Sequence, residues 1–206
     1  MQLENTVELT NFTGGDIAHA NAAWVSTSQE LTEEKKHRVP ILLSMLAENK
    51  HGTPFEHSLL SFKIRSELAT HIQFLKHRSG VSINSESARY KELLNNSYYI
   101  PGDWPEEVKS SARKSLLNSI SEYHKVLDQL TPVLGRKRAK ETSRFLLPYG
   151  HQLSYCATFN FRSFMHFQTL RNADDAQDEI ANIADQMLAL VWDTKQFNHS
   201  LKAFGF

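Results

Sequence analysis

The chain has 206 residues, enough to bury a core and to form one domain. Its 23 Lys and Arg residues balance 23 Asp and Glu residues, so no global charge attracts nucleic acid or an anionic membrane. No apolar run approaches the roughly 20 residues that a membrane span needs, and the N-terminal residues lack the pattern of a signal peptide. We therefore expect a cytoplasmic protein with no nucleic-acid or membrane partner.

Two segments in the first half have the alternating pattern of strands. They are residues 7–12 and 59–66, and in the second of them Leu60, Phe62 and Ile64 share one face. Between these segments, residues 32–49 have helical spacing.

The second half is predicted to be mainly helical. After the sequence PGDWP, apolar residues recur every three or four positions and predict a helix of about 25 residues. This stripe consists of Val108, Ala112, Leu116, Ile120, Tyr123, Leu127 and Leu130. A shorter helix from Arg136 should end at Pro148, because proline lacks the amide donor and disfavours helix in the preceding residue.

The last predicted helix opens within the sequence NADDAQDEI, with Asp174 or Asp175 as its N-cap and acidic residues in its first turn. Its inward residues are Ile180, Ile183, Ala184, Met187 and Val191. The whole pattern predicts an α+β fold, with a small mixed or antiparallel sheet packed with several long helices. The lone cysteine, Cys156, excludes an intramolecular disulfide and a Cys-rich zinc site, and its apolar surroundings predict a buried side chain.

A polar segment at residues 76–90, KHRSGVSINSESARY, is the first candidate site. Its cationic start follows an apolar stretch, where an ordered element should end in a loop. Asn84 is predicted to cap a helix starting near Ser85, whose free amide groups suit a phosphate together with Ser87 and Arg89. The alternative is that Asn84 only caps a helix and that the cations form a solvated face.

Two further clusters carry histidine and arginine. In HGTPFEH, residues 51–57, the histidines lack the i, i+4 spacing of a helical zinc pair, so contact with a polar cofactor or a structural role is favoured over metal binding. In the segment from Asn160, Arg162 and His166 are predicted to share a helix face and Arg171 to point the opposite way. Each arginine should meet an anion or a carboxylate, since burying an unpaired one is costly. The carboxylates available nearby are those of Asp174, Asp175 and Glu179.

Together these segments resemble the flavin-dependent thymidylate synthase family. That family's signature is Arg-His-Arg followed by Ser-x-Asn-x-x-Ser-x-Arg-Tyr, and this chain has KHR at residues 76–78 and SINSESARY at residues 82–90. The other similar segments are AAWVS at 22–26, HGTPFEH at 51–57, Gln73, YYIP at 98–101, RFLLP at 144–148 and NFRSFMHFQTLRNADDAQDEI at 160–180. The resemblance thus spans residues 22–180.

The resemblance implies a role for each matching residue. The FAD site would be formed by Ser26, His51, Thr53, Glu56, Lys76, His77, Arg78, Asn84, Asn160, Arg162, His166 and Leu170. The dUMP site would be formed by Gln73, Glu86, Ser87, Ala88, Arg89, Arg144 and Arg171. Because family members are homotetramers with shared active sites, the resemblance also implies a homotetramer with one synthase domain, residues 1–206, in each subunit.

The implied activity is a methyltransferase reaction, the reductive methylation of dUMP to dTMP. In this family, 5,10-methylenetetrahydrofolate donates the carbon and NADPH reduces FAD. Arg171 would be the catalytic residue that stabilises charge at the uracil carbonyl edge, and Ser87 is interpreted as a phosphate or ribose ligand. The alternatives from the residues alone are a metal-dependent hydrolase using His51, His57 and His77, and a noncatalytic nucleotide-binding module.

The chain departs from the family pattern at several positions. Lys76 replaces an arginine, and lysine cannot make the two-pronged contact of a guanidinium. Three residues separate Arg78 from Ser82 where the signature has two, so the loop is longer by one residue. A glutamate that often follows the signature asparagine is here Ser85, with Glu86 one place later. Further replacements of family residues are Trp24, His166 and Asp175.

Overall fold

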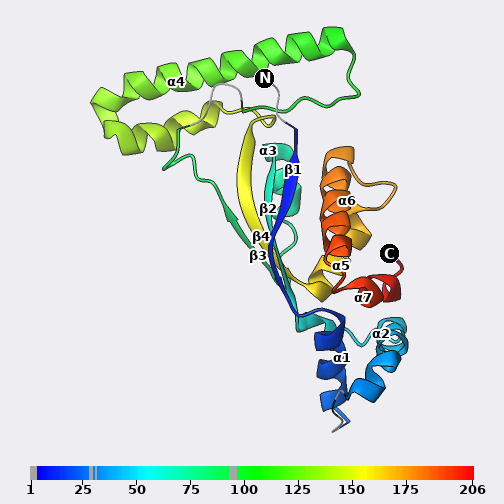
Figure 1. Cartoon of the computed structure of the whole chain (residues 1–206). Helices are drawn as coiled ribbons and strands as arrows, with labels where there is room; N and C mark the ends of the chain where they lie inside the picture. Colours follow the sequence, from blue (N-terminus) through cyan, green and yellow to red (C-terminus); the bar gives the residue numbers. More distant parts are fainter. Residues whose placement is uncertain (1–3, 28–29, 31, 93–96) are drawn as a thin grey trace. The chain divides into compact units, whose positions relative to one another are not determined.

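In the computed structural model, residues 4–27, 30, 32–92 and 97–206 are described. They form a four-stranded antiparallel sheet and several helices (Figure 1). The strand order is β1-β2-β4-β3, with bounds β1 (Thr6–Thr13), β2 (Leu59–Glu67), β3 (Val81–Ser85) and β4 (Gln152–Asn160). The predicted fold class and both predicted strands are therefore confirmed.

The helices lie between and after the strands. The α-helices are α1 (Asp16–Val25), α2 (Val39–Glu48), α3 (Leu68–Phe74), α4 (Glu106–Ser143), α5 (Phe161–Arg171), α6 (Asp178–Asp193) and α7 (Asn198–Ala203). The 3₁₀ helices are η1 (Glu33–Arg38), η2 (Thr53–Glu56) and η3 (Arg144–Leu146). None of the helices in the described part of the chain has the length and apolar character needed to cross a membrane.

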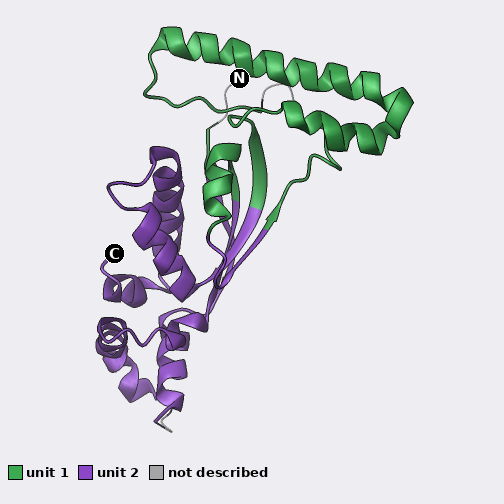
Figure 2. Cartoon of the chain, turned by 180° about the vertical axis from the view of Figure 1, so that it is seen from behind, with its two compact units in different colours: residues 1–6, 64–76, 84–155 green, residues 7–63, 77–83, 156–206 purple. Residues whose placement is uncertain are grey.

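The chain divides into two compact units, coloured separately in Figure 2. Unit 1 consists of residues 1–6, 64–76 and 84–155, and unit 2 of residues 7–63, 77–83 and 156–206. Each unit thus combines segments that are far apart in the sequence. The assignment of residues 1–206 to one synthase domain stays a prediction.

The alternation of side chains along two strands shapes the core. Leu60, Phe62 and Ile64 of β2 are fully buried, as predicted. In β4, the buried residues Tyr155 and Ala157 flank Cys156, which is exposed. The prediction of a buried cysteine is wrong because successive strand residues point to opposite faces, so apolar neighbours in sequence do not bury the residue between them.

In unit 1, α4 contains a sharp break at Gly135, where φ is 74° and ψ is 151°. The predicted second helix from Arg136 is therefore real, but it ends at Ser143 and continues as η3 before Pro148. The second run packs back on the first, since Ala139 forms one apolar cluster with Tyr123 and Leu127. The start of the predicted stripe is wrong, because Val108 is 48% exposed.

In unit 2, all five predicted inward residues of α6 are fully buried. The helix begins later than predicted, and its N-cap is Gln177 instead of Asp174 or Asp175. The acidic first turn consists of Asp178 and Glu179, as the pattern indicated. The predicted helix at residues 32–49 is a 3₁₀ helix followed by α2, with a proline in the first turn of α2.

A buried polar network joins α1 to α7 within unit 2. The His19 ring contacts the Ser58 hydroxyl through Nε2 at 2.7 Å and the Ser200 hydroxyl through Nδ1 at 2.8 Å. The Ser200 hydroxyl donates to Asp16 Oδ1 at 2.6 Å, and Asp16 also accepts the backbone N–H of His199 and Ser200. Burial is the main cause that lowers the pKa of His19 to about 3, and His57 adds to it, so the ring is neutral.

Candidate active site

The predicted helix after Asn84 is absent, since Asn84 and Ser85 belong to β3 and a turn follows. The Glu86 N–H donates to the Ser154 carbonyl at 2.9 Å, so this amide pairs with β4 and is not free for a phosphate. A short-range capping pattern was overridden by pairing with a strand about 70 residues away. The prediction of an amide-lined phosphate site at a helix N-terminus is therefore wrong.

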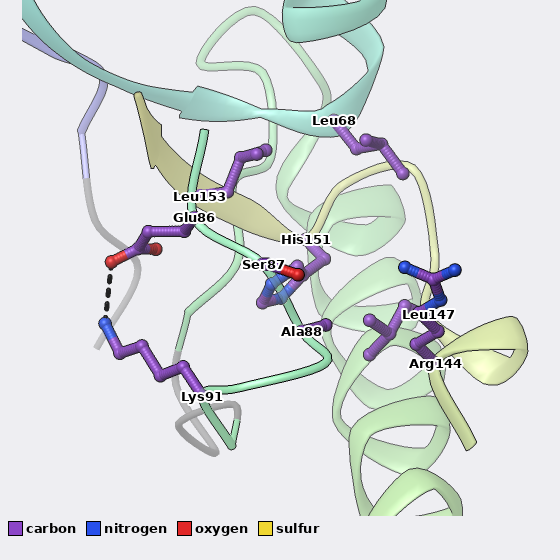
Figure 3. Close-up of a pocket in the computed structure, with 9 residues that line it drawn as sticks. All are labelled: Leu68, Glu86, Ser87, Ala88, Lys91, Arg144, Leu147, His151 and Leu153. Carbon is purple, nitrogen blue, oxygen red and sulfur yellow. Dashed lines mark hydrogen bonds and ion pairs between the residues drawn. The ribbon is translucent and has the colours of Figure 1, made fainter. Parts of the chain in front are cut away.

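The turn after β3 nevertheless forms one wall of a pocket in unit 1 (Figure 3). The cavity measures about 290 Å³ and brings together Glu86, Ser87, Ala88 and Arg144, all assigned to dUMP by the resemblance. The other residues that line it are Leu68, Lys91, Leu147, His151 and Leu153. Arg144 reaches the pocket from η3, which the break at Gly135 and the second run of α4 bring back toward the sheet residues of unit 1.

Glu86 is tied to its neighbours through both carboxylate oxygens. Oε1 accepts from Lys91 Nζ at 2.7 Å, and Oε2 accepts from the Ser154 N–H at 3.1 Å. Burial raises the pKa of Glu86, but these bonds outweigh it and the net pKa is lowered. An ionised Glu86 therefore anchors the segment and neutralises Lys91.

The two arginines of the predicted dUMP site differ in their contacts. The Arg89 guanidinium donates to Glu141 Oε1 through Nε at 2.9 Å and through Nη2 at 2.7 Å. By contrast, the Arg144 guanidinium is exposed and has no partner among the residues that the structure describes. Arg144 is thus the cation most available to an anion in this pocket. Gln73 lies on α3 in the same unit and outside the pocket lining, and Arg171 belongs to unit 2.

Unit 2 contains a cavity of about 420 Å³ at the ends of α1 and α2. Ser26, His51 and Thr53, all assigned to FAD, line it. Its other lining residues are Ala22, Ala23, Met45, Leu46, Pro54 and His57. Hydroxyl and imidazole groups beside a mostly apolar wall suit part of a dinucleotide, so the residues present fit a segment of FAD.

A second, smaller cavity of about 160 Å³ shares His51 and includes Gly52 and Arg162. Arg162 Nη1 donates to Glu56 Oε1 at 2.7 Å, so two more predicted FAD residues are paired here. The guanidinium lies directly over Gly52, where an added Cβ would be 2.6 Å from Nε. Gly52 therefore leaves the room that Arg162 occupies.

Arg171 contacts His77 at the other end of α5. Its Nε donates to His77 Nε2 at 2.9 Å, and the rings of His77 and His166 are 6.5 Å apart. Burial, then Arg171, then His166 lower the pKa of His77 to about 4, so the ring is neutral and accepts at Nε2. The prediction that each arginine meets an anion or a carboxylate is confirmed for Arg162, whose partner is Glu56 and not one of the acidic residues after α5. Arg171 instead donates to the imidazole of His77. Leu170 beside it is 46% exposed.

Asn160 caps α5, since its Oδ1 accepts from the Ser163 N–H at 2.8 Å. The Asn160 N–H donates to the Gly80 carbonyl at 3.1 Å, and Gly80 has a φ of 65°. A Cβ on Gly80 would clash with Asn160 and Ser163. The loop with the extra residue is therefore docked on the start of α5. Arg78 lies exposed in this loop, while Lys76 and Asn84 belong to unit 1.

Sequence reasoning missed both of the other polar residues that line the unit 1 pocket, Lys91 and His151. Lys91 follows the signature directly, so its position beside Arg89 and Tyr90 was a usable signal. His151 has no periodic or motif signal, because only tertiary structure places it in the pocket. Among the described residues, no group of three or more His, Cys, Asp or Glu is arranged to hold a metal ion.

Comparison with known proteins decides the family. The family model described as "Thymidylate synthase complementing protein" matches residues 8–194. A flavin-dependent thymidylate synthase of Streptomyces avermitilis is 34% identical over 196 residues, which cover 86% of this chain and 78% of the relative. The chain belongs to the flavin-dependent thymidylate synthase family. Another relative, a flavin-dependent thymidylate synthase of Thermosipho melanesiensis, is 31% identical over 193 residues, with 86% of this chain and 81% of the relative covered.

A solved structure also resembles this member of the flavin-dependent thymidylate synthase family. It is a UMP/dUMP methylase, PolB from Streptomyces cacaoi, bound with 5-Br dUMP, and it matches with a TM-score of 0.84 at 29% identity. The match covers 98% of this chain and 95% of that chain. The methylase bound with 5-Br UMP matches with a TM-score of 0.81 at 28% identity. The resemblance in the sequence motifs is therefore confirmed at the level of the family.

Proposed function

We propose that the chain is a flavin-dependent thymidylate synthase that converts dUMP to dTMP by reductive methylation. Family membership supports this function, and the observation that carries it is the unit 1 pocket with Ser87 and with Arg144, whose guanidinium has no partner among the described residues. A guanidinium can hold a phosphate through two parallel hydrogen bonds, so we assign the dUMP phosphate to Arg144. Leucine side chains of the same pocket would pack against the nucleoside.

The part of Arg89 in nucleotide binding depends on its ion pair with Glu141. Its guanidinium is held by Glu141, so it contacts a phosphate only if that ion pair opens or if its remaining N–H groups suffice. Because both side chains are partly solvent-exposed, water can replace the contacts of the ion pair when it opens. We therefore assign Arg89 to a second phosphate contact.

The FAD assignments follow the family pattern and the two unit 2 cavities. Ser26, His51 and Thr53 would hold one part of FAD, and Arg162 would contact its anionic part. When bound, FAD supplies the two electrons taken from NADPH that reduce the one-carbon unit of 5,10-methylenetetrahydrofolate to a methyl group. We assign the remaining FAD contacts to Glu56, Lys76, His77, Arg78, Asn84, Asn160, His166 and Leu170.

We assign Arg171 to the carbonyl edge of the uracil ring, where negative charge develops during methylation. The bond from Arg171 Nε to His77 leaves the terminal N–H groups of the guanidinium for the pyrimidine. Because a neutral His77 accepts without adding charge, the arginine keeps its full positive charge for the substrate. The lone thiol, Cys156, is not among the residues that line the unit 1 pocket, which agrees with a reaction that uses no cysteine nucleophile.

We further propose a cytoplasmic homotetramer that shares active sites between subunits, with one synthase domain over residues 1–206. Gln73 and Glu86 complete the proposed dUMP contacts in each subunit, with Ala88 at the pocket wall. The mass in solution tests the assembly, since light scattering should give four times the 23.6 kDa of one chain. A mass of one chain with full activity would exclude sites that need a second subunit.

Tritium release from 5-tritiated dUMP tests the activity. The purified protein should be yellow, and it should release tritium only when NADPH and methylenetetrahydrofolate are both present. A flavin-loaded protein that releases none would contradict the proposal, and a colourless protein that binds nucleotides would favour the noncatalytic module. Because the similar solved enzyme is a UMP/dUMP methylase, UMP is a second candidate substrate, and 5-tritiated UMP should be assayed in parallel.

A further inference from the structure

His151 is a buried histidine that lines the unit 1 pocket (Figure 3). Its backbone is fixed on both sides, since its N–H donates to the Pro148 carbonyl at 2.9 Å and its carbonyl accepts from the Leu68 N–H at 2.8 Å. The residue is only 5% exposed, yet its Nδ1 has no hydrogen-bond partner within the described part of the chain. Because the residue that carries this unpaired atom also lines a cavity, a ligand bound in the cavity is a group that could complete its hydrogen bonding.

The hydrogen-bonding role of this atom follows from the other contacts of the ring. Burial lowers the pKa of His151, so the ring is neutral at pH 7, while a hydrogen bond with the Ser97 backbone acts in the opposite direction. A backbone group that favours the protonated ring must be a carbonyl that accepts from it. Since Nδ1 is unpaired, the ring donates through Nε2, and Nδ1 then carries the lone pair of the neutral imidazole.

We propose that His151 is a nucleotide-binding residue whose Nδ1 accepts a hydrogen bond from a donor group of the bound nucleoside. This inference rests on the proposed function. The donor is a sugar hydroxyl or the imide N–H of uracil, because the phosphate oxygens are acceptors at neutral pH and Arg144 is available for them. Binding the nucleotide removes the cost of the unpaired Nδ1, so His151 contributes to affinity and to the recognition of an uncharged part of the substrate.

Calorimetric titration of FAD-loaded protein with dUMP tests this role. His151→Phe removes the acceptor, and we expect affinity to fall about 5- to 10-fold, the loss typical of one neutral hydrogen bond. His151→Asn places an amide oxygen near the position of Nδ1 and should restore affinity to within about 3-fold of the wild type. If His151→Phe does not fold, His151→Gln serves instead, because its amide reaches the Nε2 position and leaves Nδ1 unreplaced.

His71→Phe is the matched control. His71 is also 5% exposed, lies in the same unit and has an unpaired Nδ1, but it bonds Ser85 through Nε2 at 2.8 Å and does not line the pocket. Thermal unfolding should show a comparable loss of stability in both Phe variants, and only His151→Phe should weaken dUMP binding. Equal weakening in the two variants would overturn the proposal.

Two substrate analogues identify the donor. If the sugar hydroxyl bonds His151, then 2′,3′-dideoxyuridine monophosphate should bind wild type and His151→Phe equally; if the imide bonds it, N3-methyl-dUMP should do so. If His151→Phe binds both analogues more weakly than wild type by the same factor as dUMP, the inference alone is overturned. The same holds if His151→Phe binds dUMP as tightly as wild type does. Failure of the wild-type protein to bind dUMP overturns the proposed function and this inference with it.

Discussion

Replacing Gly52 by alanine should weaken FAD binding with little effect on stability. Gly52 has φ −75° and ψ −24°, a conformation that alanine adopts without strain. The new Cβ would lie 2.6 Å from Arg162 Nε and 2.8 Å from Cζ. Ordinary contacts are about 3.5 Å or longer, so the guanidinium must move by roughly 1 Å. It would then leave the position that we assign to an FAD contact.

The size of both effects follows from exposure. The side chains of Arg162 and Glu56 are 55% and 40% exposed, so loss of their ion pair should cost about 1 kcal/mol or less. Alanine at this backbone position offsets part of that, about 0.4–1 kcal/mol, by restricting the unfolded chain. Loss of one charged hydrogen bond to FAD corresponds to about 1.5–3 kcal/mol, or roughly 10- to 100-fold weaker binding.

Fluorescence titration of flavin-free protein with FAD, together with urea unfolding, measures the two quantities. Gly102→Ala is the matched control, because no atom lies within 4 Å of a Cβ added there. Unchanged FAD affinity in Gly52→Ala would show that Arg162, as placed here, does not contact FAD. A loss of several kcal/mol in stability would instead show that the guanidinium cannot move aside.

Three other predictions concern separate parts of the chain. Arg171→Ala should abolish tritium release while the flavin absorbance of the purified protein stays unchanged, and normal turnover would refute its assignment to the pyrimidine. Because burial lowers the pKa of His19 from 6.5 to about 3, the neutral ring stabilises the fold fully above pH 6.5, and this stability is lost as the pH falls. At pH 5, urea unfolding of the wild type should show a free energy of unfolding about 2 kcal/mol lower than at pH 8, and His19→Gln should lack this loss. The same dependence of unfolding free energy on pH in both proteins would exclude a neutral buried ring. The exposed Cys156 should react with Ellman's reagent in the native protein, whereas a thiol that reacts only after unfolding would contradict its exposed position in β4.

Sequence reasoning succeeded where burial follows a repeating pattern. The alternation of Leu60, Phe62 and Ile64 and the spacing of the apolar residues in α6 report directly which side chains face the core. The helix restart at Arg136 was also predictable, since the residue before it is Gly135, which can adopt the backbone angles that interrupt the helix. Each of these features depends on neighbours within a few positions.

Features fixed by distant partners were not predictable in this way. Asn84 has the sequence context of a cap, but pairing with β4 places it in a strand. The motif residues Ser87 and Arg144 could be assigned to one ligand only through a family resemblance, because their proximity depends on the turn back at Gly135. His151 shows the limit most clearly, since its unpaired nitrogen becomes visible only when its surroundings are known.

The pairing of β3 with β4 fixes the position of Ser87 independently of the length of the loop before Ser82. The Asn160–Gly80 and Ser154–Glu86 bonds belong to one antiparallel register, so pairing with β4 fixes the positions of residues 80–86 along that strand. Gly80, with a left-handed φ of 65°, lies in the segment between Arg78 and Ser82, which is one residue longer than the signature. A change in the length of the loop before Ser82 should therefore leave the register of β3 on β4, and with it the position of Ser87, unchanged. Loop length and the proposed nucleotide contacts can then vary independently during evolution.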